Sequence, residues 1–248
     1  MATTLVKQNV PQVLGEELVA YEQRFVQPAA AFSDSEGVTY VGFVDPKNPK
    51  YTELVAAGLR EGDPYMAYKG EFKKLSPFEF QLMDYRQLWV ERDQTGKNVI
   101  GVTAVDPRNW KSAYKENIEA AVLAFTDVGI IPAVCSFRTT KTEAGHVAIR
   151  MLRQATDPNW ASKSKDHAET AKFPLPFTRF YIATTTQRDV SKSSGFPFYK
   201  TVSTGHLITA PKAAQLQKFL TSPEGKEAIR KTMTIFDNRV QELEKLIK

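Results

Sequence analysis

A single strongly amphipathic helix with β-strand patterns on both sides is the feature that most restricts the fold of this chain. The helix is predicted over Thr140–Ala155, where Thr140 and Glu143 have the spacing of a capping box and Asp157-Pro158 ends the segment. Its apolar face consists of Ala144, Val147, Ala148, Met151, Leu152 and Ala155. Strands and helices do not alternate regularly along the chain, which disfavours a doubly wound parallel sheet. The order favours an α+β fold with a curved, mainly antiparallel sheet.

Eight segments have the composition and alternation of β-strands. Six precede the helix and two follow it: Val38–Val44, Pro64–Tyr68, Phe78–Val90, Asn98–Val105, Ile118–Thr126, Ile130–Phe137, Pro176–Arg188 and Phe196–Ile208. In the third segment the alternation slips before Leu88, which predicts a bulge or sharp bend of the kind found in small curved sheets. Such a sheet could close into an OB-like barrel.

The assignment of Ile118–Thr126 has an alternative. Glu119, Ala120 and Ala121 favour a helix, because all three are good or tolerated helix formers. The segment is followed by Asp127-Val128-Gly129, a three-residue turn with glycine where a left-handed residue would sit. We therefore predict that it forms the first strand of a hairpin.

The remaining helices are predicted towards the two ends of the chain. They are Leu14–Val26, Tyr51–Leu59, a short helix after Thr209 with Pro211 in its first turn, and a final helix that begins at Ser222-Pro223. The final helix carries a heptad seam formed by Ile229, Met233, Phe236, Val240, Leu243 and Ile247. A seam of this spacing either packs on the protein's own sheet or pairs with a copy of itself to give a homo-oligomer. The chain therefore divides into a mixed α+β domain at residues 1–208 and C-terminal helices at residues 209–248.

Composition places the chain among folded proteins that need no disulfides. Of its 248 residues 42% are apolar and 25% are charged, and its single cysteine cannot form a disulfide within the chain. Residues 1–13 lack the apolar core of a secretory signal, and no stretch approaches the roughly 18 apolar residues of a membrane-spanning helix. We therefore expect a cytoplasmic protein with no membrane partner.

Motifs for cofactors, metals and nucleophilic catalysis are missing from the sequence. It contains neither the Walker phosphate loop nor the dinucleotide-binding fingerprint, and its three histidines do not have the spacing of metal ligands. Cys135 is expected to be a buried structural thiol, and His146 a solvated residue on the surface of the capped helix. The prediction is a protein without cofactor, metal ion or catalytic residues.

One acidic group offers a less favoured alternative as an enzyme. Asp63 followed by Glu71-Phe72-Lys73 loosely matches the acid and Glu-x-Lys arrangement with which many nucleases hold a divalent cation. In such a site two carboxylates bind the metal ion and the lysine activates water. The simpler interpretation is a turn at Gly62-Asp63-Pro64 and a solvated loop around Gly70.

Basic and aromatic residues concentrate in the segment Ser136–Gly205. It contains eleven lysines and arginines against five aspartates and glutamates, a net charge of +6, whereas the whole chain carries +5. Single-stranded nucleic acid needs cations for its phosphates and flat side chains for its bases. The predicted phosphate contacts are Arg138, Arg150, Arg153, Arg179, Arg188, Lys192 and Lys200. The predicted base-stacking residues are Trp160, Tyr181, Phe198 and Tyr199.

A resemblance adds to this interpretation. Ile118–Trp160, with its hairpin, Arg-Thr-Thr-Lys sequence and helix, followed by Phe177–Tyr199, resembles uncharacterised phage and prophage proteins. In layout these stretches, about half the chain, are similar to phage single-stranded-DNA-binding proteins of the OB-fold kind. The resemblance implies a partner in single-stranded DNA and a role in DNA replication or recombination. Many such proteins end in an acidic tail, whereas this chain ends in a helix of mixed charge.

The leading hypothesis is therefore a protein that binds single-stranded DNA or RNA without sequence specificity and without catalysis. The alternative from a different class is a phage-type structural or assembly protein that acts through its C-terminal helix. A metal-dependent nuclease built on Asp63, Glu71 and Lys73 is the third hypothesis.

Overall fold

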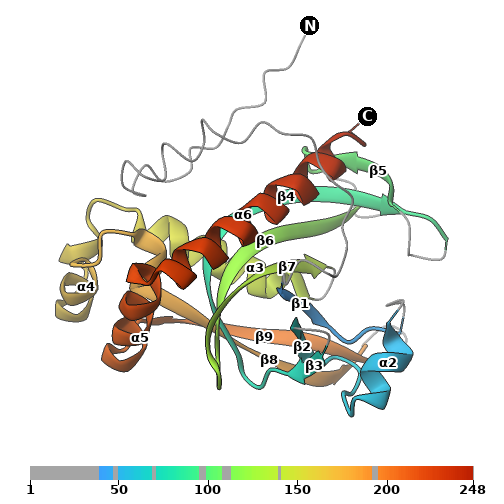
Figure 1. Ribbon diagram of the computed structural model, residues 1–248. Coiled ribbons are helices and arrows are strands. Elements are labelled where there is room, and N and C mark those ends of the chain that lie inside the picture. Colours follow the sequence, from blue (N-terminus) through green and yellow to red (C-terminus); the bar gives the residue numbers. More distant parts are fainter. Residues whose placement is uncertain are drawn as a thin grey trace, which may run out of the picture.

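The computed structural model describes residues 39–46, 50–68, 71–94, 99–107, 113–138, 141–191 and 195–247, so the predicted helix Leu14–Val26 lies outside the described residues. The strands are β1 (Thr39–Phe43), β2 (Pro64–Tyr68), β3 (Glu71–Lys74), β4 (Phe78–Arg92), β5 (Val99–Thr103), β6 (Lys115–Thr126), β7 (Gly129–Arg138), β8 (Phe180–Val190) and β9 (Pro197–Leu207). The α-helices are α2 (Tyr51–Ala56), α3 (Thr142–Ala155), α4 (Lys165–Thr170), α5 (Ala210–Thr221) and α6 (Pro223–Glu244), and 3-10 turns lie at Trp160–Ser162 and Pro176–Arg179 (Figure 1).

The strands form one open sheet in the order β3-β2-β1-β7-β6-β4-β8-β9, with β5 paired to β4 beside this path. The strand pairs are antiparallel except for β1 and β7, which run parallel. The predicted α+β fold with a mainly antiparallel sheet is therefore confirmed. Within the described residues β3 and β9 lie at opposite edges, and no pairing closes the sheet into a barrel.

Strand β4 joins three parts of the sheet. It pairs with β8 at its beginning, with β6 along most of its length and with β5 near its end. The register with β6 shifts between Leu82 and Asp84, which confirms the predicted bulge, although it lies earlier than the slip before Leu88. A bulge bends a strand and increases its twist. The bend lets one long strand serve both the β6–β7 hairpin and the β8–β9 hairpin.

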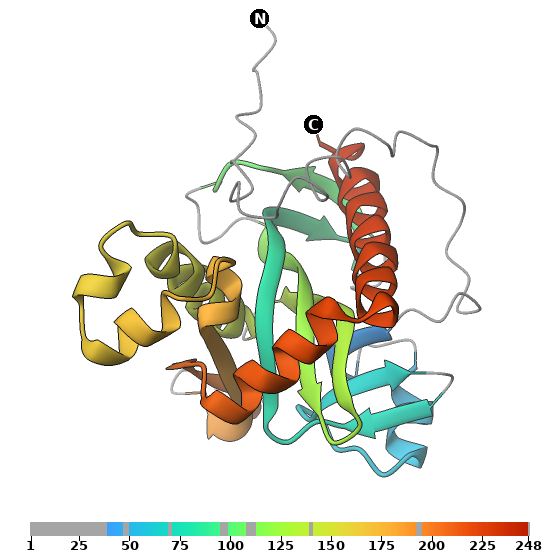
Figure 2. The ribbon, with the colours of Figure 1, turned by 60° about the vertical axis from the view of Figure 1, so that its left-hand side comes forward.

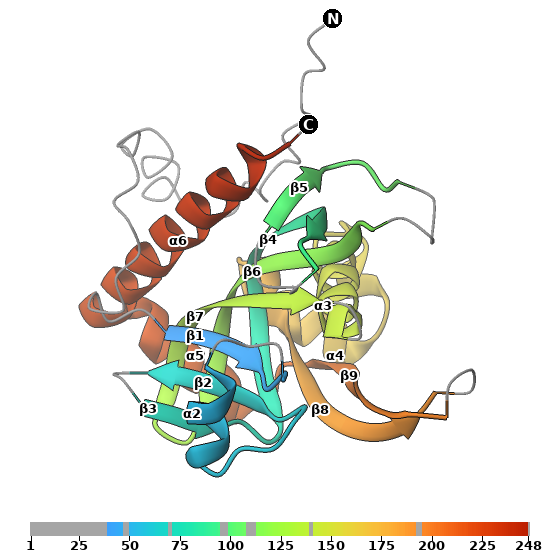
Figure 3. The ribbon, with the colours of Figure 1, turned by 90° about the vertical axis from the view of Figure 1, so that its right-hand side faces the viewer.

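Helices cover the two faces of this sheet. In Figure 3, α3 lies on one side of β6 and β7 and α6 lies on the other. Ile118 of β6 faces α3, where Gly145 comes so close that a Cβ atom on it would lie 2.7 Å from Ile118 Cδ1. On the opposite face, Ala121 of β6 packs with Phe236 and Val240 of α6. Both faces of β6 are therefore buried, one under α3 and the other under α6. This explains why the sequence of the strand is nearly continuously apolar.

The C-terminal helices pack on the sheet of their own chain. Figure 2 shows α5 crossing in front of the long strands and α6 running beside them. Phe236 and Val240 of the predicted seam lie against β6 and β7, and Leu243 and Ile247 pack with Leu88, Val90 and Val102. The seam is thus used within the chain. Pairing of the same seam with a copy of the protein stays a prediction, and it would require α6 to leave the sheet.

The β8–β9 ribbon curves away from the main sheet (Figure 3). At its base Gly205 lies against Met151 of α3, and a Cβ atom there would come within 2.6 Å of Met151 Cγ. Further along, Gly62 of the turn before β2 lies against the ribbon, where a Cβ atom would be 2.6 Å from Tyr199 Cβ. The ribbon therefore contacts both α3 and the β1–β2 region, although no strand pairing joins β9 to the other edge.

Three local predictions need correction. Helix α3 begins at Thr142, two residues later than predicted, with Lys141 as its N-cap residue and no side-chain capping bond, and Thr140 of the expected capping box lies outside the described residues. The strand predicted from Pro176 begins only at Phe180, because Pro176–Arg179 forms a 3-10 turn. The loop was expected around Gly70, which lies outside the described residues, and Glu71–Lys74 directly after it form strand β3, which pairs with β2. The hairpin interpretation of Ile118–Thr126 is confirmed.

Candidate nucleic-acid interface

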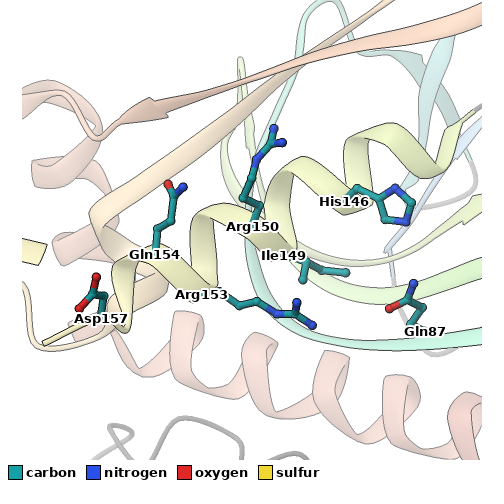
Figure 4. A pocket seen from close by; sticks show the side chains of 7 residues that line it. All are labelled: Gln87, His146, Ile149, Arg150, Arg153, Gln154 and Asp157. Carbon is teal, nitrogen blue, oxygen red and sulfur yellow. The ribbon is translucent and has the colours of Figure 1, made fainter. Parts of the chain in front are cut away.

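Helix α3 carries two of the predicted phosphate contacts, three residues apart, whose side chains extend in different directions (Figure 4). Arg150 and Arg153 are both exposed, and they border an open hollow of about 540 Å³. The hollow is lined by Gln87, His146, Ile149, Arg150, Arg153, Gln154 and Asp157. Figure 4 shows that six of these residues come from α3 and the turn that follows it, whereas Gln87 comes from β4. The opposite helix face is buried, because Ala144, Ala148 and Leu152 pack into the core as the sequence pattern predicts.

Arg150 is the more available of the two arginines. Among the described residues no carboxylate or hydrogen-bond acceptor pairs with its guanidinium. The Arg153 Nη2 atom lies 3.5 Å from the hydroxyl oxygen of Tyr85 on β4, a long hydrogen bond. Both guanidinium groups can therefore receive an anion without giving up an ion pair.

Two residues that line the hollow, Gln87 and His146, contact the carboxylate of Glu116 on β6. Glu116 Oε1 accepts a hydrogen bond of 2.5 Å from Gln87 Nε2 and lies 2.7 Å from His146 Nε2. His146 has a side chain that is 49% exposed, which confirms that it is a surface residue. The contact with the Glu116 carboxylate orients the imidazole of His146.

At the far end of the helix the last acidic group is also paired. Asp157 accepts a hydrogen bond from the backbone N–H of Asn159 and lies 3.4 Å from Lys163 Nζ. The backbone hydrogen bond, followed by Lys163, holds the pKa of Asp157 below its usual range. The carboxylate charge nearest to Arg153 and Gln154 is thus partly neutralised by its own neighbours.

The predicted contacts on the β8–β9 ribbon lie on two different faces. Arg188 is exposed and is the cross-strand partner of Tyr199, so these two side chains share the face that contacts α3 and Gly62. Lys200 and Phe198 alternate to the other face. Lys200 Nζ lies 2.6 Å from Asp189 Oδ2, and this hydrogen bond raises the pKa of Lys200. Lys192 lies outside the described residues.

Two predicted contacts are structural residues. The Arg179 guanidinium donates to the backbone oxygens of Phe173 at 3.0 Å and Ala155 at 2.6 Å, so its donors join the 3-10 turn to the end of α3. Trp160 is only 1% exposed, and its indole N–H donates to Thr170 Oγ1 at 3.0 Å. The Trp160 ring therefore offers almost no exposed surface to a base. Arg179 is partly exposed but already donates to two carbonyl oxygens, and phosphate binding by it stays a prediction.

Two further predicted residues lie on the face of the sheet opposite to α3. Arg138, at the end of β7, is on the same face as Ser136, which hydrogen-bonds beneath α6. Its Nε atom is buried without a hydrogen-bond partner. The Tyr181 ring is covered on one side by His206, with ring centroids 5.1 Å apart, and Lys212 Nζ lies 4.9 Å from the ring. Neither residue shares the surface formed by Arg150 and Arg153.

The acidic group proposed for a nuclease does not assemble. Asp63 directly precedes β2 and pairs with Lys74 Nζ at 2.8 Å, whereas Glu71 is the cross-strand partner of Tyr68 at the other end of β2. In the described part of the chain no group of histidine, cysteine and carboxylate side chains could hold a metal ion. Cys135 is buried, as predicted, and burial raises the pKa of its thiol.

Residues of β4 in this region were not found by sequence reasoning. Tyr85 and Gln87 contribute to the α3 surface because they alternate on one side of β4, after the bulge. The alternation itself is visible in the sequence, but the position of α3 over it is not.

Comparisons with models of known protein families, with curated proteins and with solved structures find no match to this chain. None of the helices in the described part of the chain combines the length and the apolar character that crossing a bilayer requires.

Proposed function

We propose that the protein binds single-stranded nucleic acid without sequence specificity, that the outer face of α3 receives the phosphates, and that no bond of the strand is cleaved. The observation that carries the proposal is the pair of exposed guanidinium groups of Arg150 and Arg153 beside an open hollow. Arginine binds phosphate through several donors in one plane and keeps its charge at every physiological pH. A cytoplasmic location agrees with this function.

The strand connections support the proposal. Strands β4, β6 and β7 pair as antiparallel neighbours, and after α3 the chain returns so that β8 pairs with the beginning of β4. We interpret β4, β6, β7, β8 and β9 as an open variant of the five-stranded, partly open barrel of the OB type. Barrels of this type bind oligonucleotides across their strands and the loops at their ends.

The test is fluorescence anisotropy of a labelled oligo(dT) strand, titrated with the protein at several salt concentrations. We expect affinity to fall steeply with salt, because each phosphate contact releases counterions from the strand. The Arg150→Ala/Arg153→Ala variant should bind more weakly and should lose about 1.4 from the slope of log affinity against log salt, at roughly 0.7 per contact with a single strand.

The matched control is Lys218→Ala/Lys226→Ala, which removes the same charge from exposed positions on α5 and α6. This variant should retain the salt slope of the unaltered protein. The proposal fails if the unaltered protein does not bind at low salt. It also fails if both double variants lose the same affinity, since binding would then depend on overall charge and not on α3.

A further inference from the structure

Trp89 is a third element of the α3 surface, and its position follows from the alternation of β4. Gln87 lines the hollow beside α3, whereas Leu88 and Val90 are buried on the opposite face with Leu243 and Ile247 of the C-terminal helix region. Side chains two residues apart in a strand share a face. The Trp89 indole therefore lies on the α3 side of the sheet, beside Gln87.

The side chain of Trp89 is partly exposed. Within the described residues it forms no hydrogen bond and no contact with another ring or with a cation. Trp160 differs in both respects, because it is buried and its N–H is bonded to Thr170. A partly exposed tryptophan on a strand presents a large flat surface whose burial against a ligand would be favourable.

The charges around Trp89 are arranged asymmetrically. Arg150 and Arg153 lie on the helix side of the hollow, and Glu116 is the cross-strand neighbour of Trp89 on β6. Glu91 follows two residues later on the same face of β4. The arginines attract phosphates to the α3 side of the hollow, and the carboxylates on β4 and β6 repel them. A bound nucleic acid would therefore turn its bases towards β4.

We propose that Trp89 is a base-stacking residue, and that it stacks on an unpaired base of the strand whose phosphates contact Arg150 and Arg153. The inference rests on the proposed function and adds a substrate requirement to it. Cations on one side of a groove and an aromatic side chain on the other are the combination with which proteins bind single strands. Stacking on Trp89 requires an accessible base face, so strands with unpaired bases bind more tightly than a duplex of equal length.

The experiment compares the unaltered protein with Trp89→Ala and Trp89→Phe, using labelled oligo(dT) and an abasic strand of the same length. Trp89→Ala should weaken oligo(dT) binding by roughly 5- to 100-fold, the range that corresponds to the loss of one stacked base. Trp89→Phe should lose less, because it retains an aromatic face. Binding of the abasic strand, which has the phosphates but no bases, should be equal in all three proteins.

Tryptophan fluorescence supplies an independent measurement. Oligo(dT) should quench the fluorescence of the unaltered protein, and this quenching should be absent in Trp89→Phe and with the abasic strand. Salt-dependent oligo(dT) binding that is unchanged in Trp89→Ala would overturn the role of Trp89 and leave the proposed function standing. If oligo(dT) does not bind at all, the proposed function and this inference both fall. If Trp89→Ala does not fold, the role of Trp89 is tested by comparing the fluorescence quenching of the unaltered protein with that of Trp89→Phe.

Discussion

Arg239 of helix α6 donates a hydrogen bond of 2.6 Å from Nε to Oε2 of Glu119, a carboxylate with no exposed surface in the middle of β6. The same carboxylate accepts hydrogen bonds from Asn117 Nδ2 at 2.8 Å and from Ser136 Oγ at 2.5 Å. One ion pair, in which the carboxylate is fully buried and the arginine is partly exposed, thus connects the C-terminal helix to the centre of the sheet. A charge of this kind is tolerated in an interior only when it is paired and hydrogen-bonded.

We expect the two members of this pair to be strongly coupled. Arg239→Met leaves the fully buried Glu119 without its counter-ion and should lower the free energy of unfolding by about 3–5 kcal/mol. Glu119→Gln should cost less, because the Arg239 side chain is 27% exposed and still donates a hydrogen bond to Ser136 Oγ. The double variant removes both charges and should lose clearly less than the sum of the single losses. Urea unfolding of the four proteins measures the coupling, and additive losses would contradict it.

The same site predicts a dependence of stability on pH. Burial alone would raise the pKa of Glu119, but Arg239, Arg138 and the hydrogen bond from Ser136 together hold it below its ordinary value of 4.5. A carboxyl with a lowered pKa in the folded state stabilises the protein above the pKa that it has in the unfolded chain. That contribution is lost as the pH falls from about 4.5 towards the folded-state pKa.

The measurement is the free energy of unfolding between pH 7 and pH 3 for the unaltered protein and Glu119→Gln. The unaltered protein should lose more stability below pH 4.5 than the variant does, because only it contains a carboxylate that must be protonated there. Parallel curves for the two proteins would show that other acidic groups control the acid unfolding.

The contact between the turn before β2 and the β8–β9 ribbon can be tested with two glycines of equal backbone conformation. Gly62 and Gly58 both have φ of +83°, but a Cβ atom on Gly58 would meet no atom within 4 Å, whereas on Gly62 it would lie 2.6 Å from Tyr199. Gly58→Ala should cost about 1–2 kcal/mol, the strain of a left-handed alanine. Gly62→Ala should cost more, because the turn must also move away from the ribbon. Equal losses in thermal unfolding would show that the ribbon yields without cost.

Local patterns in the sequence predict where the strands and helices of this protein lie along the chain. They predict less well which of these elements contact one another in space. The bulge in β4, the β6–β7 hairpin and the apolar face of α3 each follow from residues close together in the chain. The position of α6 over β6 does not, because it depends on contacts between residues far apart in the chain, such as the ion pair of Glu119 and Arg239 and the packing of Phe236 on Ala121. The sequence identifies Glu119 only as a residue that favours a helix, since a strand pattern does not indicate a buried carboxylate.

The candidate site was also predicted only in part, because local patterns indicate which side chains are exposed and not which partners the fold brings to them. Arg150 and Arg153 lie on the polar face of an amphipathic helix, so their exposure follows from periodicity. Arg179 and Trp160 have the same chemistry in the sequence, but their partners are backbone carbonyls and a threonine that the fold brings to them. Composition identifies a basic and aromatic segment, and it cannot separate the cations that bind a ligand from those that hold the segment together.

Arg150 and Arg179 therefore provide a final prediction: loss of the first arginine should weaken oligo(dT) binding, and loss of the second should lower stability. Arg150→Ala removes a guanidinium without a partner in the described residues, so it should weaken oligo(dT) binding and leave stability within about 0.5 kcal/mol of the unaltered protein. Arg179→Ala leaves the carbonyl oxygens of Phe173 and Ala155 without their donor and should cost about 1–3 kcal/mol of stability. Under conditions in which it stays folded, it should bind oligo(dT) with unchanged affinity. Urea unfolding and anisotropy on both variants measure the two effects, and a loss of affinity in folded Arg179→Ala would return that residue to the interface.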